Sequence, residues 1–164
     1  MLERFYPDHE KDSVYKLDFE GLYVKGYRGI IFDIDNTLVP HGAPADKQAI
    51  RLFKRLHRIG FDTVLLSNNK EPRVKSFAEQ VQSDYIFKAN KPGAGGYLKA
   101  MEMMDTTKEN TIFIGDQLFT DVWGAKKLGI VTYLVKPIHP KEEIQIVLKR
   151  KLEWIVLYFY YRRK

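Results

Sequence analysis

Apolar and polar residues fall into blocks along the chain that predict buried strands separated by amphipathic helices. Short, almost entirely apolar runs are typical of strands covered on both faces of a sheet. Such runs predict strands at residues 29–34, 63–66, 85–87, 111–114 and 130–135. Between them, apolar positions recur every three or four residues and predict helices at 45–59, 71–81, 95–104 and 121–128.

The alternation of strands and helices predicts the architecture. It indicates βαβ units, which build a parallel sheet with helices on both faces. We therefore predict the α/β class, with a three-layer, Rossmann-like fold. The chain is expected to form one domain over residues 1–164. Within it we predict an irregular lead-in over 1–27, a core over 28–135 and a basic, aromatic C-terminal helix over 136–164.

Composition excludes several classes of protein. The 164 residues are 45% hydrophobic and 29% charged, which excludes a disordered chain. The absence of cysteine excludes disulfides, thiolate metal sites and a cysteine nucleophile. No apolar run reaches the roughly 20 residues of a membrane-spanning helix, and no secretory signal is visible, so we expect a cytoplasmic protein. The net charge of +6 favours anionic partners: phosphorylated substrates, nucleic acid or anionic lipid.

Four groups of polar residues follow predicted strands, where parallel α/β sheets bind their ligands. The first strand leads into DIDNT (residues 33–37) and the second into SNN (67–69). The dipeptide KP (91–92) follows the third strand, and GDQLFTD (115–121) follows the fourth. A lone DxD recurs by chance, but four such groups in this order, each behind an apolar strand, form a specific signal.

These four motifs resemble those of phosphatases in the haloacid dehalogenase superfamily, across residues 28–135. The finer resemblance is to subfamily IIIA: a small bacterial group whose leader runs into GIIFDIDNTLV, and the phosphatidylglycerophosphate phosphatases of mitochondria and plastids. A signalling receiver domain combines similar residues, but its lysine comes last. The order of residues here therefore disfavours the receiver.

The resemblance implies a phosphatase acting through two aspartates and a metal ion. Asp33, at the tip of a buried strand, is the expected nucleophile and would form an aspartyl-phosphate. Asp35 would protonate the leaving group and later activate water. The expected metal ligands are Asp33, Asp116 and the backbone carbonyl of Asp35, with Asp121 near the metal. Oxygen ligands without His or Cys favour Mg²⁺.

Three further residues are expected to bind the phosphoryl group. Ser67 and Lys91 match the second and third motifs, and Asn68 could offer its backbone N–H. Lys88 competes with Lys91, but the proline after Lys91 matches the family pattern. Simpler roles stay open for four residues: Asp35 and Thr37 as turn formers, Ser67 as a turn residue and Asp121 as a helix N-cap.

No segment has room for the cap domain that covers the site in many members of this superfamily. Only residues 38–46 separate the first motif from the next helix, so we predict a capless, open site. An open site suits a phospholipid headgroup, such as phosphatidylglycerophosphate. Alternatives are a phosphatase of nucleotides or nucleic-acid ends, and a low-activity module that binds RNA or the ribosome. Intact Asp33 and Asp35 argue against the last of these.

The C-terminal segment has a pattern of its own. Residues 154–161 are all apolar or aromatic and lie between the basic runs 149–151 and 162–164. Trp and Tyr favour the headgroup level of a membrane, and Lys and Arg meet anionic lipid, so we expect peripheral contact with the inner face of a membrane. Two alternatives stay open: packing on the sheet or on a second subunit, and stacking on RNA. The sequence leaves the oligomeric state undecided.

Overall fold

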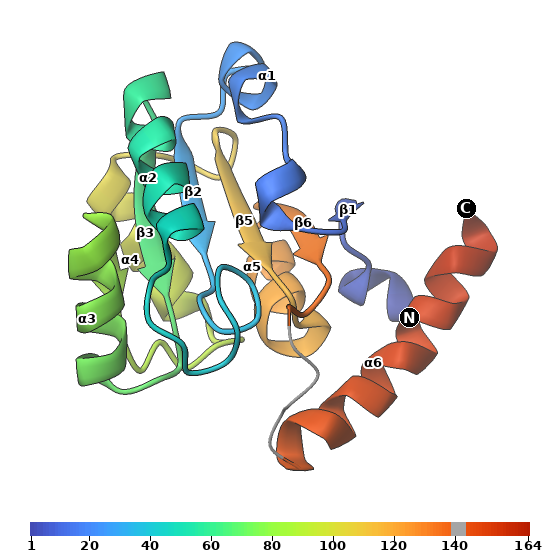
Figure 1. The fold of residues 1–164 in the computed structure, drawn as a ribbon. Coiled ribbons are helices and arrows are strands. Elements are labelled where there is room, and N and C mark those ends of the chain that lie inside the picture. The colour runs from blue at the N-terminus through green and yellow to red at the C-terminus, as the bar shows by residue number, and fades with distance from the viewer. Residues whose placement is uncertain (139–143) are drawn as a thin grey trace.

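A computed structural model describes residues 1–138 and 144–164 and is built on one parallel sheet (Figure 1). The strand order is β1-β6-β5-β2-β3-β4, and all neighbouring strands are parallel. The strands are β1 (His9–Lys11), β2 (Gly29–Phe32), β3 (Asp62–Leu66), β4 (Asp84–Ile86), β5 (Thr111–Gly115) and β6 (Val131–Val135). The predicted α/β class and parallel sheet are confirmed.

Helices cover both faces of the sheet, as the three-layer prediction requires. One face carries α1 (Phe19–Val24), α2 (Lys47–Ile59) and α3 (Glu71–Val81), and the other carries α4 (Ala94–Met104) and α5 (Trp123–Lys127). Successive strand residues point to opposite faces. Ile30 and Phe32 therefore pack in the first core, while Ile31 packs in the second. Full burial of all four residues of β2 explains why its sequence is a continuous apolar run.

Capping residues fix the two ends of α2 and thereby the length of the loop between β2 and α2. The Asp46 carboxylate accepts a hydrogen bond from the Ala49 N–H at 2.8 Å, and Gly60 ends the helix at φ 120°. The connection from β2 to α2 is therefore a loop of residues 33–46. No cap domain is inserted there or elsewhere in the residues that the structure describes.

The lead-in is more ordered than predicted. Residues 1–27 form a 3₁₀ turn η1 (Leu2–Phe5), strand β1, a second 3₁₀ turn η2 (Val14–Lys16) and helix α1. Strand β1 pairs with β6 and adds a sixth strand to the sheet. Phe5, Val14 and Phe19 are buried. The irregular prediction is wrong here because elements of three to six residues are too short to show a hydrophobic period.

Helix α6 (Ile144–Arg163) packs beside the N-terminal segment and away from α2 and α3 (Figure 1). Its Glu153, Val156 and Tyr160, spaced three and four residues apart, are buried. Val156 joins a third core with Phe5 of η1. One face of α6 therefore packs on the body of the protein, while the remaining aromatic residues of the helix are exposed. Among the described residues, no helix combines the length and hydrophobicity needed to cross a bilayer.

Candidate active site

Three buried carboxylates meet at the carboxyl edge of the sheet. Asp33 directly follows the central strand β2, and its backbone N–H still bonds to the carbonyl of Ile114 in β5 at 3.0 Å. Asp116 directly follows β5, and Asp121 lies in η3 (Leu118–Val122), a π-helical turn. One carboxylate oxygen of each aspartate lies within 4.8 Å of the others. The fold thus brings together side chains from the first and fourth motifs.

Asp121 owes its position to the fold of the fourth motif. Its carboxylate accepts hydrogen bonds from the backbone N–H groups of Asp116 at 3.2 Å and Gln117 at 3.1 Å. Gly115 permits this approach, because a Cβ there would lie 2.5 Å from an Asp121 oxygen. Asp121 therefore braces its own loop and does not cap α5, whose N-cap is Val122. The helix predicted to start at 121 begins earlier, as η3.

Lys91 is the cation at the centre of this cluster. Its Nζ donates to Asp33 Oδ1 at 3.0 Å and to Asp121 Oδ1 at 2.7 Å. The Asn68 side chain holds the Lys91 backbone: its amide nitrogen donates to the Lys91 carbonyl at 3.1 Å, and its oxygen accepts from the Lys91 N–H at 2.7 Å. Lys88, the competing candidate, is exposed. The structure therefore places Lys91, not Lys88, against the carboxylates.

Burial and mutual repulsion make the carboxylates reluctant to ionise. Burial, reinforced by Asp116 and opposed by Lys91, raises the pKa of Asp33 to about 7. Burial also raises the pKa of Asp116 and of Asp121, and a neighbouring carboxylate adds to each shift. Burial lowers the pKa of Lys91, but the negative charges of Asp121 and Asp33 outweigh burial, so the pKa of Lys91 is raised. A cluster that resists ionisation in this way is suited to a further cation.

Asp35 lies two residues beyond Asp33 and has different surroundings. Its Oδ1 accepts hydrogen bonds from the Gly42 backbone N–H at 2.7 Å and from Arg73 at 3.0 Å. Burial favours a higher pKa, but the Gly42 bond and Arg73 together outweigh it and hold the pKa of Asp35 below its ordinary value. In this structure Asp35 is therefore an ion-paired carboxylate.

The predicted residues line one open cavity of about 320 Å³. Ser67 follows β3 and is buried, with its Oγ accepting from the Asn69 N–H at 3.1 Å. Asp116 belongs to the carboxylate cluster but does not line this cavity. The loop residue His41 and the α6 residue Lys149 border it as well. The predicted residues that line it are Asp33, Asp35, Ser67, Asn68, Lys91 and Asp121.

Sequence reasoning missed three contacts to the cluster. The Thr37 hydroxyl, considered only as a turn former, lies 3.3 Å from both Asp33 Oδ2 and Asp116 Oδ1. The Tyr97 hydroxyl lies within hydrogen-bond distance of the backbone carbonyls of Thr120, at 2.8 Å, and Asp121, at 3.1 Å. Arg150 of α6 donates to the carboxylate and the carbonyl of Asp116. The basic run containing Arg150 was visible, but nothing in the sequence indicated that it docks on the site.

Comparisons with known proteins agree on one family. The family model of the haloacid dehalogenase-like hydrolases matches residues 44–129. The chain is also 35% identical over 159 residues to the probable phosphatase YqeG of Bacillus subtilis, covering 96% of this chain and 92% of that protein. The chain belongs to the haloacid dehalogenase-like hydrolases. The phosphatase-named relative supports a phosphatase as the activity class of this hydrolase.

Two further matches are more distant. The hydrolase is 29% identical over 160 residues to the chloroplastic and mitochondrial phosphatidylglycerophosphate phosphatase 1 of Arabidopsis thaliana. The match covers 90% of this chain but only 45% of the plant protein. A solved deoxy-D-mannose-octulosonate 8-phosphate phosphatase from Haemophilus influenzae, in its cobalt-bound form, superposes with a TM-score of 0.54 at 15% identity, over 71% of this chain and 70% of that one. That likeness supports the fold.

Proposed function

We propose that this hydrolase is a Mg²⁺-dependent phosphatase that cleaves phosphate monoesters through an aspartyl-phosphate on Asp33. The observation that carries the proposal is the buried cluster at the carboxyl edge. There Asp33 lies within reach of one lysine, Lys91, and two further carboxylates, Asp116 and Asp121. Phosphoryl transfer depends mainly on positioning and on neutralising the charge of the phosphoryl oxygens. This cluster offers a rigid nucleophile and a cation for that purpose.

The donor set fits a hard divalent cation. Asp33, Asp116 and Asp121 present carboxylate oxygens within 4.8 Å of one another. Burial and mutual repulsion raise their pKa values, even though Lys91 and Arg150 supply positive charge. These residues, with the backbone carbonyl of Asp35, would hold Mg²⁺. Asp116 would bind it through Oδ1, because Arg150 contacts its Oδ2. When bound, the ion would supply positive charge for the phosphoryl oxygens.

The residues of the chain account for both chemical steps. In the first, a carboxylate oxygen of Asp33 bonds to phosphorus while the bond from phosphorus to the ester oxygen breaks, and Asp35 gives a proton to the departing oxygen. In the second, Asp35 takes a proton from water as that water attacks phosphorus, which releases inorganic phosphate and frees the Asp33 carboxylate. Lys91 and Ser67 would hold the phosphoryl oxygens in both steps.

The ion pair with Arg73 bears on how Asp35 acquires its proton. As a carboxylate held by Arg73 and Gly42, Asp35 is ready for the second step, in which it acts as a base. The first step needs its protonated form. A doubly negative phosphate entering the site would repel the carboxylate and raise the pKa of Asp35. We propose that substrate binding itself thereby converts Asp35 into the acid.

We further propose a phospholipid headgroup, such as phosphatidylglycerophosphate, as the phosphate carrier. Three observations support it. The described residues include no cap domain, the Arabidopsis relative is a phosphatidylglycerophosphate phosphatase by name, and α6 exposes aromatic residues between basic runs beside the site. Such a substrate would bring the protein to the surface of an anionic membrane, with the bulk of the enzyme in the cytoplasm. Nucleotide and nucleic-acid-end phosphates are the rival substrates.

A substrate screen tests the proposal. Release of inorganic phosphate is measured with Mg²⁺ from phosphatidylglycerophosphate, nucleotides, oligonucleotide ends and sugar phosphates, with Asp33→Asn as the control for contaminating activity. The lipid phosphate is expected to react fastest. Faster turnover of a nucleotide or an oligonucleotide end would contradict the lipid substrate. No turnover of any phosphate, together with RNA binding, would favour the binding module.

A further inference from the structure

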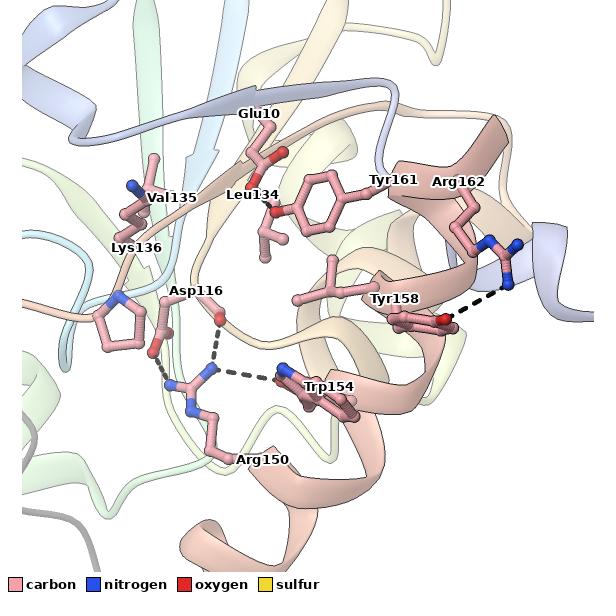
Figure 2. Close-up of a pocket in the computed structure, with 13 residues that line it drawn as sticks. Glu10, Asp116, Leu134, Val135, Lys136, Arg150, Trp154, Tyr158, Tyr161 and Arg162 are labelled. Atoms are coloured by element: carbon pink, nitrogen blue, oxygen red, sulfur yellow. Dashed lines mark hydrogen bonds and ion pairs between the residues drawn. The ribbon is translucent and has the colours of Figure 1, made fainter. Parts of the chain in front are cut away.

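A second cavity, of about 530 Å³, lies between α6 and the end of β6 (Figure 2). We call it the α6 groove. Trp154, Leu157 and Tyr158 of α6 line one side, and Leu134 and Val135 of β6 line the other. Pockets that bind small ligands have volumes of roughly 300–1,000 Å³ and mainly apolar walls with a few polar groups. The α6 groove has the size and the lining of such a pocket.

The α6 groove adjoins the catalytic cluster. Asp116 and Arg150 both line it, and Arg150 donates to the carboxylate and the carbonyl of Asp116 (Figure 2). The preceding residue, Lys149, lines the catalytic cavity instead. The two cavities are therefore neighbours, separated by consecutive residues of one helix. A ligand with its phosphate near Asp33 could extend a tail past this helix into the groove.

The acidic groups around the α6 groove are already paired. Asp116 and Glu153 accept hydrogen bonds from Arg150, and Glu10 accepts one from the Tyr161 hydroxyl. What the groove offers to a ligand is therefore mostly aromatic and aliphatic surface. Such surface favours a hydrocarbon chain, because the removal of CH₂ groups from water is favourable.

The charge around the α6 groove favours a hydrocarbon chain that carries an anionic group. Residues 144–164 include one acidic side chain, Glu153, against six basic ones: Lys149, Arg150, Lys151, Arg162, Arg163 and Lys164. An anionic amphiphile complements both the apolar groove and this charge. A second copy of the chain does not, because a twofold contact through this face would bring the same basic helix against itself.

We propose that the α6 groove is an acyl-chain site, which holds one hydrocarbon chain of a lipid whose phosphate lies in the neighbouring catalytic cavity. The inference rests on the proposed function for the identity of the headgroup. The groove would make turnover selective for lipid phosphates by anchoring the chain.

Trp154 provides a direct probe of the α6 groove. The chain has two tryptophans, and Trp123→Phe leaves Trp154 as the sole tryptophan, which is excited selectively at 295 nm, while keeping an aromatic ring against Phe5. The probe is 12-bromododecyl phosphate, used below its micelle concentration with EDTA to suppress hydrolysis, since bromine quenches tryptophan fluorescence at close range. Saturable quenching is expected. Absence of quenching, or quenching that rises without saturation, would overturn the proposal.

Two neighbouring aromatic residues supply a matched pair of variants. Tyr158 lines the α6 groove and is 44% exposed, whereas Phe159 does not line it and is 46% exposed. In the Trp123→Phe background, Tyr158→Ser is expected to raise the half-saturating probe concentration at least fivefold, and Phe159→Ser to leave it within twofold. Equal weakening in both variants would overturn the groove in favour of unspecific adsorption to the helix.

Two further measurements separate the remaining outcomes. A dimer in sedimentation analysis that Tyr158→Ser converts to a monomer would identify a second copy as the occupant and overturn the proposal. Quenching is measured in EDTA, without catalysis. It therefore tests the acyl-chain site separately from the proposed phosphatase activity. Saturable quenching in a protein that hydrolyses no phosphate would support the α6 groove and contradict the proposed function. Normal phosphatase activity without quenching would overturn the groove alone.

Discussion

Asp33 shows how burial sets the chemistry of a single residue. Its position at the end of a fully buried strand holds the carboxylate rigidly, but burial also raises its pKa to about 7. A protonated carboxyl cannot attack phosphorus, so the nucleophile depends on neighbouring positive charge. Lys91 provides part of that charge at 3.0 Å. A bound divalent cation would provide the rest, and it would also favour the ionised form of Asp33.

The raised pKa of Asp33 predicts how stability depends on pH in the absence of metal. Its pKa is 3.8 ordinarily and about 7 in the folded protein, so folding favours the protonated form. The stability this group contributes is complete below pH 4 and is lost as pH rises through 7. We expect Asp33→Asn to raise the melting temperature at pH 8 by several degrees, with less effect at pH 5. Thermal unfolding in EDTA at both pH values measures this.

The control for that experiment is the metal itself. Mg²⁺ at pH 8 is expected to stabilise the wild-type protein by favouring ionised Asp33, and to stabilise Asp33→Asn much less. If the change from pH 5 to pH 8 shifted the melting temperature of both proteins equally, Asp33 would not be the titrating group.

The proposed acid role of Asp35 predicts a dependence on the leaving group. A good leaving group, such as nitrophenolate, departs without a proton, whereas an alkoxide needs one. Asp35→Asn is therefore expected to lose about 10²–10⁴-fold in rate on an alkyl phosphate and much less on nitrophenyl phosphate. Steady-state rates on the two esters measure the difference. Equal losses on both would assign Asp35 a structural role.

At the scale of elements, the sequence predicted the sheet and the C-terminal helix well, but not the order of the N-terminal segment or the docking of α6. The residues brought together in the site lie in short motifs directly after apolar strands, so the strand pattern alone placed Asp33, Ser67, Lys91 and Asp116 at one edge. Strand β1 was missed because three residues show no period. The contact of Arg150 with Asp116 depends on how α6 docks, and no local pattern encodes the docking of a helix.

The packing of α6 can be tested with two adjacent residues. Val156 is 4% exposed and lies in the core with Phe5 and Leu118, whereas Ile155 is 48% exposed. Val156→Ala removes buried methyl groups and is expected to lower the free energy of unfolding by about 2 kcal/mol. Ile155→Ala is expected to change it by less than about 0.5 kcal/mol. Chemical denaturation compares them, and equal values would mean that α6 does not pack as described.

At the scale of the whole molecule, the exposed aromatic residues of α6 lie on one side of the protein (Figure 1). Helix α6 lies beside the N-terminal segment, while α2 and α3 lie at the opposite side of the sheet (Figure 1). The catalytic cavity and the α6 groove both border α6. A membrane that met the exposed aromatic residues of α6 would therefore lie next to the open site. This arrangement would present a headgroup to Asp33 without a cap domain.

This arrangement predicts salt-dependent binding to vesicles of anionic lipid. Each basic residue near such a surface contributes about 1 kcal/mol, and salt screens this attraction. The triple variant Arg162→Gln, Arg163→Gln, Lys164→Gln removes the cations at the end of the chain. Its affinity for the vesicles, measured by co-sedimentation, is expected to fall at least tenfold.

The matched control makes the same change of charge on the opposite side of the molecule. Arg51, Lys54 and Arg58 are exposed on α2, so Arg51→Gln, Lys54→Gln and Arg58→Gln remove three charges far from α6. Because attraction to a surface falls off within a Debye length of about 8 Å at physiological salt, this control is expected to bind vesicles nearly as well as the wild type. Equal weakening by both triple variants would show that net charge, not the α6 face, governs binding. Binding that 0.5 M salt leaves unchanged would contradict an electrostatic contact altogether.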